Sequence, residues 1–267
     1  MAIRNFRFLF LRRFFQLGLL TVFAAGNYFG ITHWVRGNLS SSMFFDRIPL
    51  SDPFAVLQIF LSGHLMDSRV LTGAVIVLIL YALFIGRAFC SWACPINMVA
   101  DLATWLHGQL GFRHLLKIPE KTRFVILILT LVLTPILGVA AFEWVSPIGI
   151  VQRFVILGVT GGWMIITSIF LFDLFIMKHG FCGHICPLGA FYSLLGKKAL
   201  LSVRFDAEKC TDCMKCHKIC PEPQVLHHIL EIKKGFDGVR DSACTNCGRC
   251  IDVCDDRALL FVAGLKK

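Results

Sequence analysis

Residues 210–221 read Cys210-Thr-Asp-Cys213-Met-Lys-Cys216-His-Lys-Ile-Cys220-Pro221, and residues 244–254 read Cys244-Thr-Asn-Cys247-Gly-Arg-Cys250-Ile-Asp-Val-Cys254. Both runs have the cysteine spacing C-x2-C-x2-C-x3-C, but Asp255 stands in the second run where Pro221 stands in the first. Thiolates at such short intervals are soft ligands, which favour zinc or iron–sulfur clusters. These two runs therefore decide the fold and the chemistry of the C-terminal part of the chain.

The spacing is the pattern of bacterial ferredoxins with two clusters, in which the fourth cysteine of each run binds the cluster of the other run. We therefore predict two [4Fe–4S] clusters. The first is assigned to Cys210, Cys213, Cys216 and Cys254, and the second to Cys244, Cys247, Cys250 and Cys220. The alternative is a pair of zinc sites, but zinc favours two C-x2-C pairs separated by a longer gap.

The rest of the chain is unusually apolar. Hydrophobic residues make up 56% of the sequence and charged residues only 16%, against about 25% in average soluble proteins. Four stretches contain no Asp, Glu, Lys or Arg: residues 14–35, 70–86, 124–142 and 154–172. An apolar helix crosses a bilayer with about 20 residues. We therefore predict four transmembrane helices and exclude a soluble protein with a single core.

The basic residues are distributed unevenly around these stretches. If each stretch spans the membrane in turn, 23 Lys and Arg residues lie on one side and 4 on the other. Cytoplasmic segments carry the excess of basic residues, so both termini are predicted to be cytoplasmic. The same charges explain the net charge of +10 without nucleic-acid binding. The first stretch is longer than the apolar core of a signal peptide, about 7–15 residues, so we interpret it as an anchor.

The expected fold class is thus a membrane all-α domain of four transmembrane helices, followed by an α+β ferredoxin-like domain. We place the first domain at residues 1–200 and the second at residues 201–267. Between the first two spans, Asp52-Pro53 is a helix-start signal, and the apolar segment after it is too short to span.

Two further cysteine pairs follow the second and fourth apolar stretches. They read Phe89-Cys90-Ser-Trp-Ala-Cys94-Pro95 and Phe181-Cys182-Gly-His-Ile-Cys186-Pro187, so all 12 cysteines belong to four motifs. On a helix the i, i+4 spacing places both thiols on one face, and the proline suits a helix start or a break. Three interpretations stay open: a further metal or cluster site, redox-active thiols, or small buried structural residues.

A membrane protein with iron–sulfur clusters needs a redox partner, and a lipid-soluble quinol suits that role. The site of a quinol needs hydrogen-bond partners for two oxygens, a proton acceptor and an apolar slot. We predict His64 and Glu143, near the outer ends of the spans, as this site. Other polar candidates near span ends are His33, Trp34, Asp67 and Trp144 on the outer rim, and Asp101, His107, Asp173, His179 and His184 on the inner rim. Asp173 at a span end is a functional hypothesis by default.

With these features together, the chain resembles the NapH family of membrane ferredoxin-type proteins. The resemblance covers nearly the whole chain and is most specific in the outer segments. The matching stretches are residues 37–42, 48–53, 62–65 and 71–75, both F-C-x3-C-P motifs, and Cys220-Pro221-Glu222-Pro223.

The resemblance implies a quinol dehydrogenase component in the bacterial cytoplasmic (inner) membrane. It would pass electrons from the quinol pool through [4Fe–4S] clusters towards periplasmic nitrate reductase, with a periplasmic ferredoxin-type partner. The alternative is a redox-maintenance or assembly factor for a periplasmic metalloenzyme, without bulk electron flux. A third hypothesis is a scaffold that only docks the periplasmic partner.

Overall fold

The computed structural model describes residues 6–28, 35–45, 47–111, 115–116, 118–158, 161–227, 239 and 241–264. The chain divides into two compact units. The C-terminal unit consists of Met1–Phe15, Tyr81–Ala93 and Tyr192–Lys267, and the helical unit consists of Gln16–Leu80 and Cys94–Phe191. The unit with the ferredoxin cysteines therefore also contains the start of the first apolar helix and the end of the second. The division predicted at residue 200 stays a prediction.

Among the described residues, two helices are long and apolar enough to cross a membrane. The first is α1 (Arg7–Tyr28), with 22 residues, and the second runs over 25 residues from Ser68 to Trp92. The second helix consists of α3 (Ser68–Ile79), the π-helix η2 (Leu80–Ile85), the 3₁₀ turn η3 (Gly86–Ala88) and α4 (Phe89–Trp92). Their lengths match an apolar layer about 30 Å thick. By length and composition, both helices could therefore cross a membrane.

The other two apolar stretches form shorter helices. Helix α6 (Thr122–Leu137) has 16 residues and ends where Gly138 takes a left-handed conformation. The stretch at 154–172 is divided, because α8 (Pro147–Leu157) ends at Gly158 and α9 (Gly162–Leu171) begins after Gly161, both with positive φ. Helix α9 continues as the π-helix η4 (Phe172–Ile176). Neither helix reaches about 20 residues, so the predicted count of four spans is not confirmed.

A small sheet occupies the segment between the first two long helices. Strands β1 (Val35–Gly37), β2 (Ser41–Phe44) and β3 (Ile48–Ser51) pair antiparallel in that order. Asp52 then caps α2 (Pro53–Leu61) by accepting a hydrogen bond from the Phe54 amide, which confirms the predicted helix start. The strands were not foreseen in the sequence.

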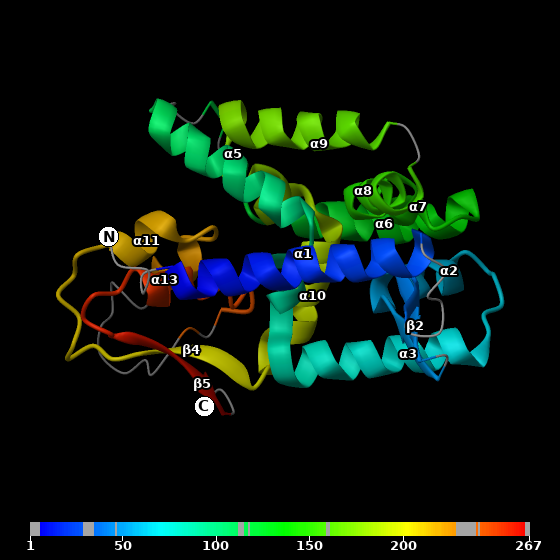
Figure 1. The fold of residues 1–267 in the computed structure, drawn as a ribbon, viewed down its shortest axis with the longest axis horizontal. Helices are drawn as coiled ribbons and strands as arrows, with labels where there is room; N and C mark the ends of the chain where they lie inside the picture. Colours follow the sequence, from blue (N-terminus) through cyan, green and yellow to red (C-terminus); the bar gives the residue numbers. More distant parts are fainter. Residues whose placement is uncertain are drawn as a thin grey trace. The chain divides into compact units, whose positions relative to one another are not determined.

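The remaining helices of the helical unit lie around this framework. They are α5 (Ile96–Leu110), α7 (Ala141–Val145), the π-helix η5 (Phe181–Ile185) and the first part of α10 (Pro187–Leu195). Helices α5 and α9 run side by side, and α8 lies beside α7 (Figure 1). Pro95 and Pro187 each stand at a helix start, as their position after the second cysteine of each pair predicts.

The C-terminal unit is built on a two-stranded sheet. After the 3₁₀ turn η6 (Gly196–Lys198), β4 (Leu201–Phe205) pairs antiparallel with β5 (Leu259–Ala263), so that Val203 faces Phe261 (Figure 1). The short helices α11 (Lys215–Ile219) and α13 (Arg249–Asp252) each contain the third cysteine of a run, Cys216 and Cys250. Buried residues such as Val203, Phe205 and Leu259 form a core against which the cysteines pack.

Candidate iron–sulfur site

The two cysteine runs enclose two separate cavities in the C-terminal unit. Four cysteines, Cys220, Cys244, Cys247 and Cys250, line one cavity. The other four, Cys210, Cys213, Cys216 and Cys254, line the second cavity. Each cavity thus combines three cysteines of one run with the fourth cysteine of the other, which is the crossed arrangement expected from the spacing. That these cysteines bind clusters stays a prediction.

The chemistry of each cavity fits a cubane cluster. Four sulfur donors surround each cavity, and a cubane is held by four cysteine thiolates that bind different iron atoms. In the described part of the chain, no three His, Cys, Asp or Glu residues come together as a single metal ion would require. A zinc ion needs four ligands that converge on one point. The four cysteines around each cavity are the donor set that a cubane requires.

The backbone of the two runs repeats the same turns. Asp212 and Asn246, each two residues after the first cysteine, have φ values of 58° and 49°. Met214 and Gly248, each four residues after the first cysteine, have φ values of 56° and 74°. The side-chain oxygen of Asp212 accepts from the Cys210 thiol and that of Asn246 from the Cys244 thiol. Asp and Asn tolerate the left-handed region, so the loop shape follows from local sequence.

Burial disfavours the thiolate form of four of these cysteines. It raises the pKa of Cys210 and Cys216, and raises the pKa of Cys220 and Cys250 much further, with the neighbouring thiols adding to the effect. Iron is bound by thiolates, so loading of either cavity must release protons.

The two cavities differ in exposure. Cys247 and Cys250 are buried, whereas Cys213 is exposed. Beside Cys213, Met214 is 41% exposed and Lys215 forms an exposed ion pair with Asp255 at 2.6 Å. The Cys213 side of the unit is therefore the side that faces solvent.

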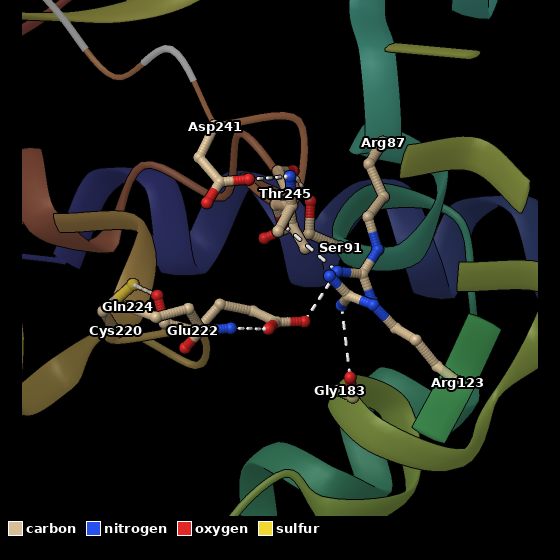
Figure 2. A network of polar contacts seen from close by, with 10 residues as sticks. Arg87, Ser91, Arg123, Gly183, Cys220, Glu222, Gln224, Asp241 and Thr245 are labelled. Atoms are coloured by element: carbon tan, nitrogen blue, oxygen red, sulfur yellow. Dashed lines mark hydrogen bonds and ion pairs between the residues drawn. The ribbon is translucent and has the colours of Figure 1, made fainter. Parts of the chain in front are cut away.

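The Cys220–Cys244 cavity is held by the end of the second long helix. Arg87 Nη1 lies 2.6 Å from Glu222 Oε1 and donates to the Ala243 carbonyl at 3.1 Å, and the pair is almost completely buried (Figure 2). Glu222 follows Cys220 by two residues and Ala243 precedes Cys244, so Arg87 joins the two segments that carry these cysteines. Gln224 donates to the other oxygen of Glu222.

Three more hydrogen bonds extend this contact. Ser91 Oγ donates to the Thr245 carbonyl at 2.7 Å, and Trp92 Nε1 donates to the Asn246 carbonyl at 3.0 Å. The Asn246 amide in turn donates to the Ile85 carbonyl at 3.0 Å. From the sequence, Arg87 was counted only among the basic residues that flank the apolar stretches, so this contact was not predicted. The one feature that could have singled it out is its position between an apolar stretch and an F-C-x3-C-P motif.

The two cysteines of each C-x3-C-P motif do not share one regular α-helix. Helix α4 ends at Trp92, so Cys90 is inside it and Cys94 is beyond it, and Cys182 lies in the π-helix η5 with Cys186 as its extended cap. Cys90 and Cys182 are half-buried, and Cys94 and Cys186 are buried. In the second motif, the buried Arg123 side chain donates to the Gly183 carbonyl at 3.1 Å (Figure 2).

The two predicted quinol residues lie in the helical unit. His64 is exposed in the loop after α2 and contacts the Ser62 hydroxyl at 3.0 Å. Glu143 is half-buried in α7 and accepts from the Ser40 hydroxyl at 2.8 Å. Within the described residues they do not contact one another, and the outer quinol site stays a prediction. His33 and Trp34 lie outside the described residues.

Sequence comparisons agree with this chemistry. Residues 202–255 match the family model described as a 4Fe-4S dicluster domain, and residues 68–113 and 159–206 match one described as a 4Fe-4S binding domain. The second match includes both C-x3-C-P motifs. Fold, cysteine cavities and matches together define a ferredoxin-type iron–sulfur protein, a class that transfers electrons.

Full-length relatives then give the family. The chain is 43% identical to the ferredoxin-type protein NapH of Escherichia coli, over 95% of this chain and 88% of the relative. It is 43% identical to NapH of Haemophilus influenzae, over 96% and 89%. It is 41% identical to the methylamine utilization ferredoxin-type protein MauN of Methylorubrum extorquens, over 83% and 77%. The chain belongs to the NapH family. No solved structure matches it.

Proposed function

We propose that this protein is the membrane component of a quinol dehydrogenase, and that it passes electrons from quinol through two [4Fe–4S] clusters towards periplasmic nitrate reductase. The observation that carries the proposal is the pair of cavities, each lined by four cysteines from both runs. Each cluster, when bound, accepts and releases one electron at a time. The chain supplies four sulfurs to each cluster, a buried surround for one and an exposed edge for the other.

The proposed ligands are the two crossed sets. Cys210, Cys213, Cys216 and Cys254 hold one cluster, and Cys244, Cys247, Cys250 and Cys220 hold the other. Purified protein should contain about eight irons and as many acid-labile sulfides per chain. Zinc in place of iron would contradict the assignment.

We further propose that Cys90, Cys94, Cys182 and Cys186 form an additional redox or metal site. Its support is the match of both segments to a 4Fe-4S binding domain. The iron analysis separates the interpretations, because a third cubane raises the content to about twelve irons per chain. If the content stays at eight in anaerobically prepared protein, a cluster at these cysteines is excluded. Thiol labelling of reduced and oxidised protein then distinguishes redox-active from structural cysteines.

The proposed topology has four spans and cytoplasmic termini in a bacterial inner membrane. It is supported by the two long apolar helices and by the 23 to 4 division of basic residues. Labelling of single introduced cysteines at residues 66, 116 and 146 in whole cells tests it, since only segments outside the inner membrane should react with an impermeant reagent. The same cells allow cross-linking to the expected periplasmic ferredoxin-type partner.

The test of function is direct. Oxidised protein in detergent is mixed with a quinol analogue under anaerobic conditions, and cluster reduction is followed by visible absorbance and low-temperature EPR. Reduction by the quinol supports the proposal. If dithionite reduces the clusters but quinols do not, the proposed function is contradicted.

A second candidate is a redox-maintenance or assembly factor for a periplasmic metalloenzyme. The reason to keep it is a relative named for methylamine utilization, 41% identical over 83% of this chain, because that name concerns a system other than nitrate reduction. In this case quinol does not reduce the clusters, and the dependent reductase accumulates in an immature form in cells that lack the protein.

A further inference from the structure

Asp173 is a fully buried carboxylate within the apolar segment formed by α9 and η4. Its Oδ1 accepts the amide N–H of Phe181 at 3.0 Å. Its Oδ2 is also buried and finds no hydrogen-bond donor in the described part of the chain. A buried polar atom without a partner is destabilising, and such an atom in a native protein calls for a physical explanation.

A buried pair of ionisable side chains, Asp101 and His179, lies next to this carboxylate. His179 Nε2 is 3.8 Å from Asp101 Oδ1, and the two side chains are only 5% and 8% exposed. Asp101 also interacts electrostatically with Asp173. The three side chains come from α5, from η4 and from the turn before η5, and together they form one cluster of ionisable groups, which we call the buried acid–histidine cluster.

The surrounding backbone holds this cluster rigidly. His179 has a φ of 49°, in the left-handed region that a non-glycine residue seldom occupies. At Gly180, an added Cβ would lie 2.7 Å from the Phe172 ring, so only glycine allows the turn to approach η4. His107 Nδ1 lies 2.6 Å from the Leu174 carbonyl and ties α5 to η4. Strained turns and π-helical segments gather at functional sites.

The cluster has the chemistry of a proton acceptor. In the proposed topology α9 and η4 belong to a membrane span, where ionisable side chains are costly and mark proton or ion pathways. A carboxylate and an imidazole are the usual general bases. Asp173 Oδ2 is a buried oxygen to which no group in the described part of the chain donates a hydrogen bond. His179 precedes Cys182 by three residues, so the cluster also adjoins the second C-x3-C-P motif along the chain.

We propose that the buried acid–histidine cluster accepts the protons that quinol releases, with Asp173 as the first acceptor. This inference rests on the proposed oxidation of quinol. Each O–H bond of the quinol breaks, its proton goes to the protein and its electron goes to an iron–sulfur centre, and the two C–O bonds become the carbonyls of the quinone. In total, two electrons and two protons leave each quinol, one electron at a time. Asp173 Oδ2 takes one proton, and the Asp101–His179 pair takes the other.

The test compares variants of the full chain in detergent. Asp173→Asn keeps an oxygen for the Phe181 amide but removes the base, so reduction of the clusters by menadiol should slow roughly 10²- to 10⁴-fold. Iron content and reduction by dithionite should not change. Glu208→Gln, an exposed carboxylate of the C-terminal unit, is the matched control and should react at the wild-type rate.

Infrared difference spectra give a readout independent of the rate. Quinol oxidation should produce the C=O band of a protonated carboxylic acid in the wild type, and Asp173→Asn should lack it. If Asp173→Asn loses iron, His179→Gln is measured in the same way and should also slow reduction by menadiol.

The outcomes separate the two proposals. If Asp173→Asn has an unchanged rate and an unchanged infrared band, the inference is overturned. It is also overturned if Glu143→Gln loses reactivity with quinol while Asp173→Asn retains it, because this result places the quinol site at the outer residues. A wild-type protein whose clusters do not react with menadiol overturns the proposed function instead.

Discussion

The ion pair between Arg87 and Glu222 offers the sharpest test of how the end of the second long helix supports the clusters. The side chains are only 1% and 4% exposed, and Arg87 also donates to the Ala243 carbonyl. Replacing either partner alone by methionine leaves a buried charge without compensation. Such a change costs about 3–5 kcal/mol, whereas replacing both partners by apolar residues is often close to neutral.

This energy converts into a measurable rate. Because 1.4 kcal/mol is a factor of ten, a loss of about 3–5 kcal/mol raises the population of the opened state from roughly 10²-fold to roughly 4 × 10³-fold. When opening and closing are fast, attack on the opened state follows that population. Loss of visible absorbance to an iron chelator should therefore be faster by this factor in Arg87→Met and in Glu222→Met, and should return towards the wild-type rate in the double variant.

The matched control is the exposed pair of Lys215 and Asp255, which has the same N–O distance of 2.6 Å but side chains that are 53% and 62% exposed. Methionine at both positions should leave the chelation rate unchanged, since exposed pairs contribute little. If the single Arg87 and Glu222 variants lose iron no faster than this control, or if the double variant loses it as fast as the single ones, the reasoning is refuted.

Three further predictions concern the same cavity. The first concerns the reduction potential of the cluster proposed at Cys220, Cys244, Cys247 and Cys250, since a positive charge nearby favours the reduced cluster. Arg87→Gln should therefore lower this potential, and Glu222→Gln should raise it. EPR-monitored titration measures both potentials, and shifts of the same sign would contradict the electrostatic reason. Gly248→Ala should reduce iron occupancy, since Gly248 has a φ of 74° and a Cβ there would lie 2.5 Å from the Phe8 ring. Met214 occupies the equivalent position of the first cysteine run and is exposed, so Met214→Ala should retain full iron. Asn246→Asp should weaken the contacts of residue 246 with the second long helix and with β4 by about 1–3 kcal/mol, because it loses the side-chain amide that donates to the Ile85 and Leu201 carbonyls. Wild-type chelation kinetics in this variant would show that these two hydrogen bonds do not stabilise the cavity.

The sequence by itself determined the features that depend on local spacing and composition. The repeated cysteine spacing predicted two crossed sets of four sulfurs, and the structure encloses a cavity with each set. The helix start at Asp52 was equally visible, since a cap and a proline act within one turn. The long apolar stretches at residues 14–35 and 70–86 likewise correspond to helices long enough to span a membrane.

Tertiary structure decided what long-range contacts control. The contact between Arg87 and Glu222 joins residues 135 positions apart, and no local pattern distinguishes Arg87 from another flanking arginine. Composition alone could not show that Gly158 and Gly161 divide the last apolar stretch, because hydropathy measures transfer to lipid and not backbone conformation. Burial of Asp173 beside Asp101 and His179 also depends on how α5, η4 and the following turn pack. The charge and spacing of residues can be read from the sequence, but an ionisable group is desolvated only when distant segments pack around it.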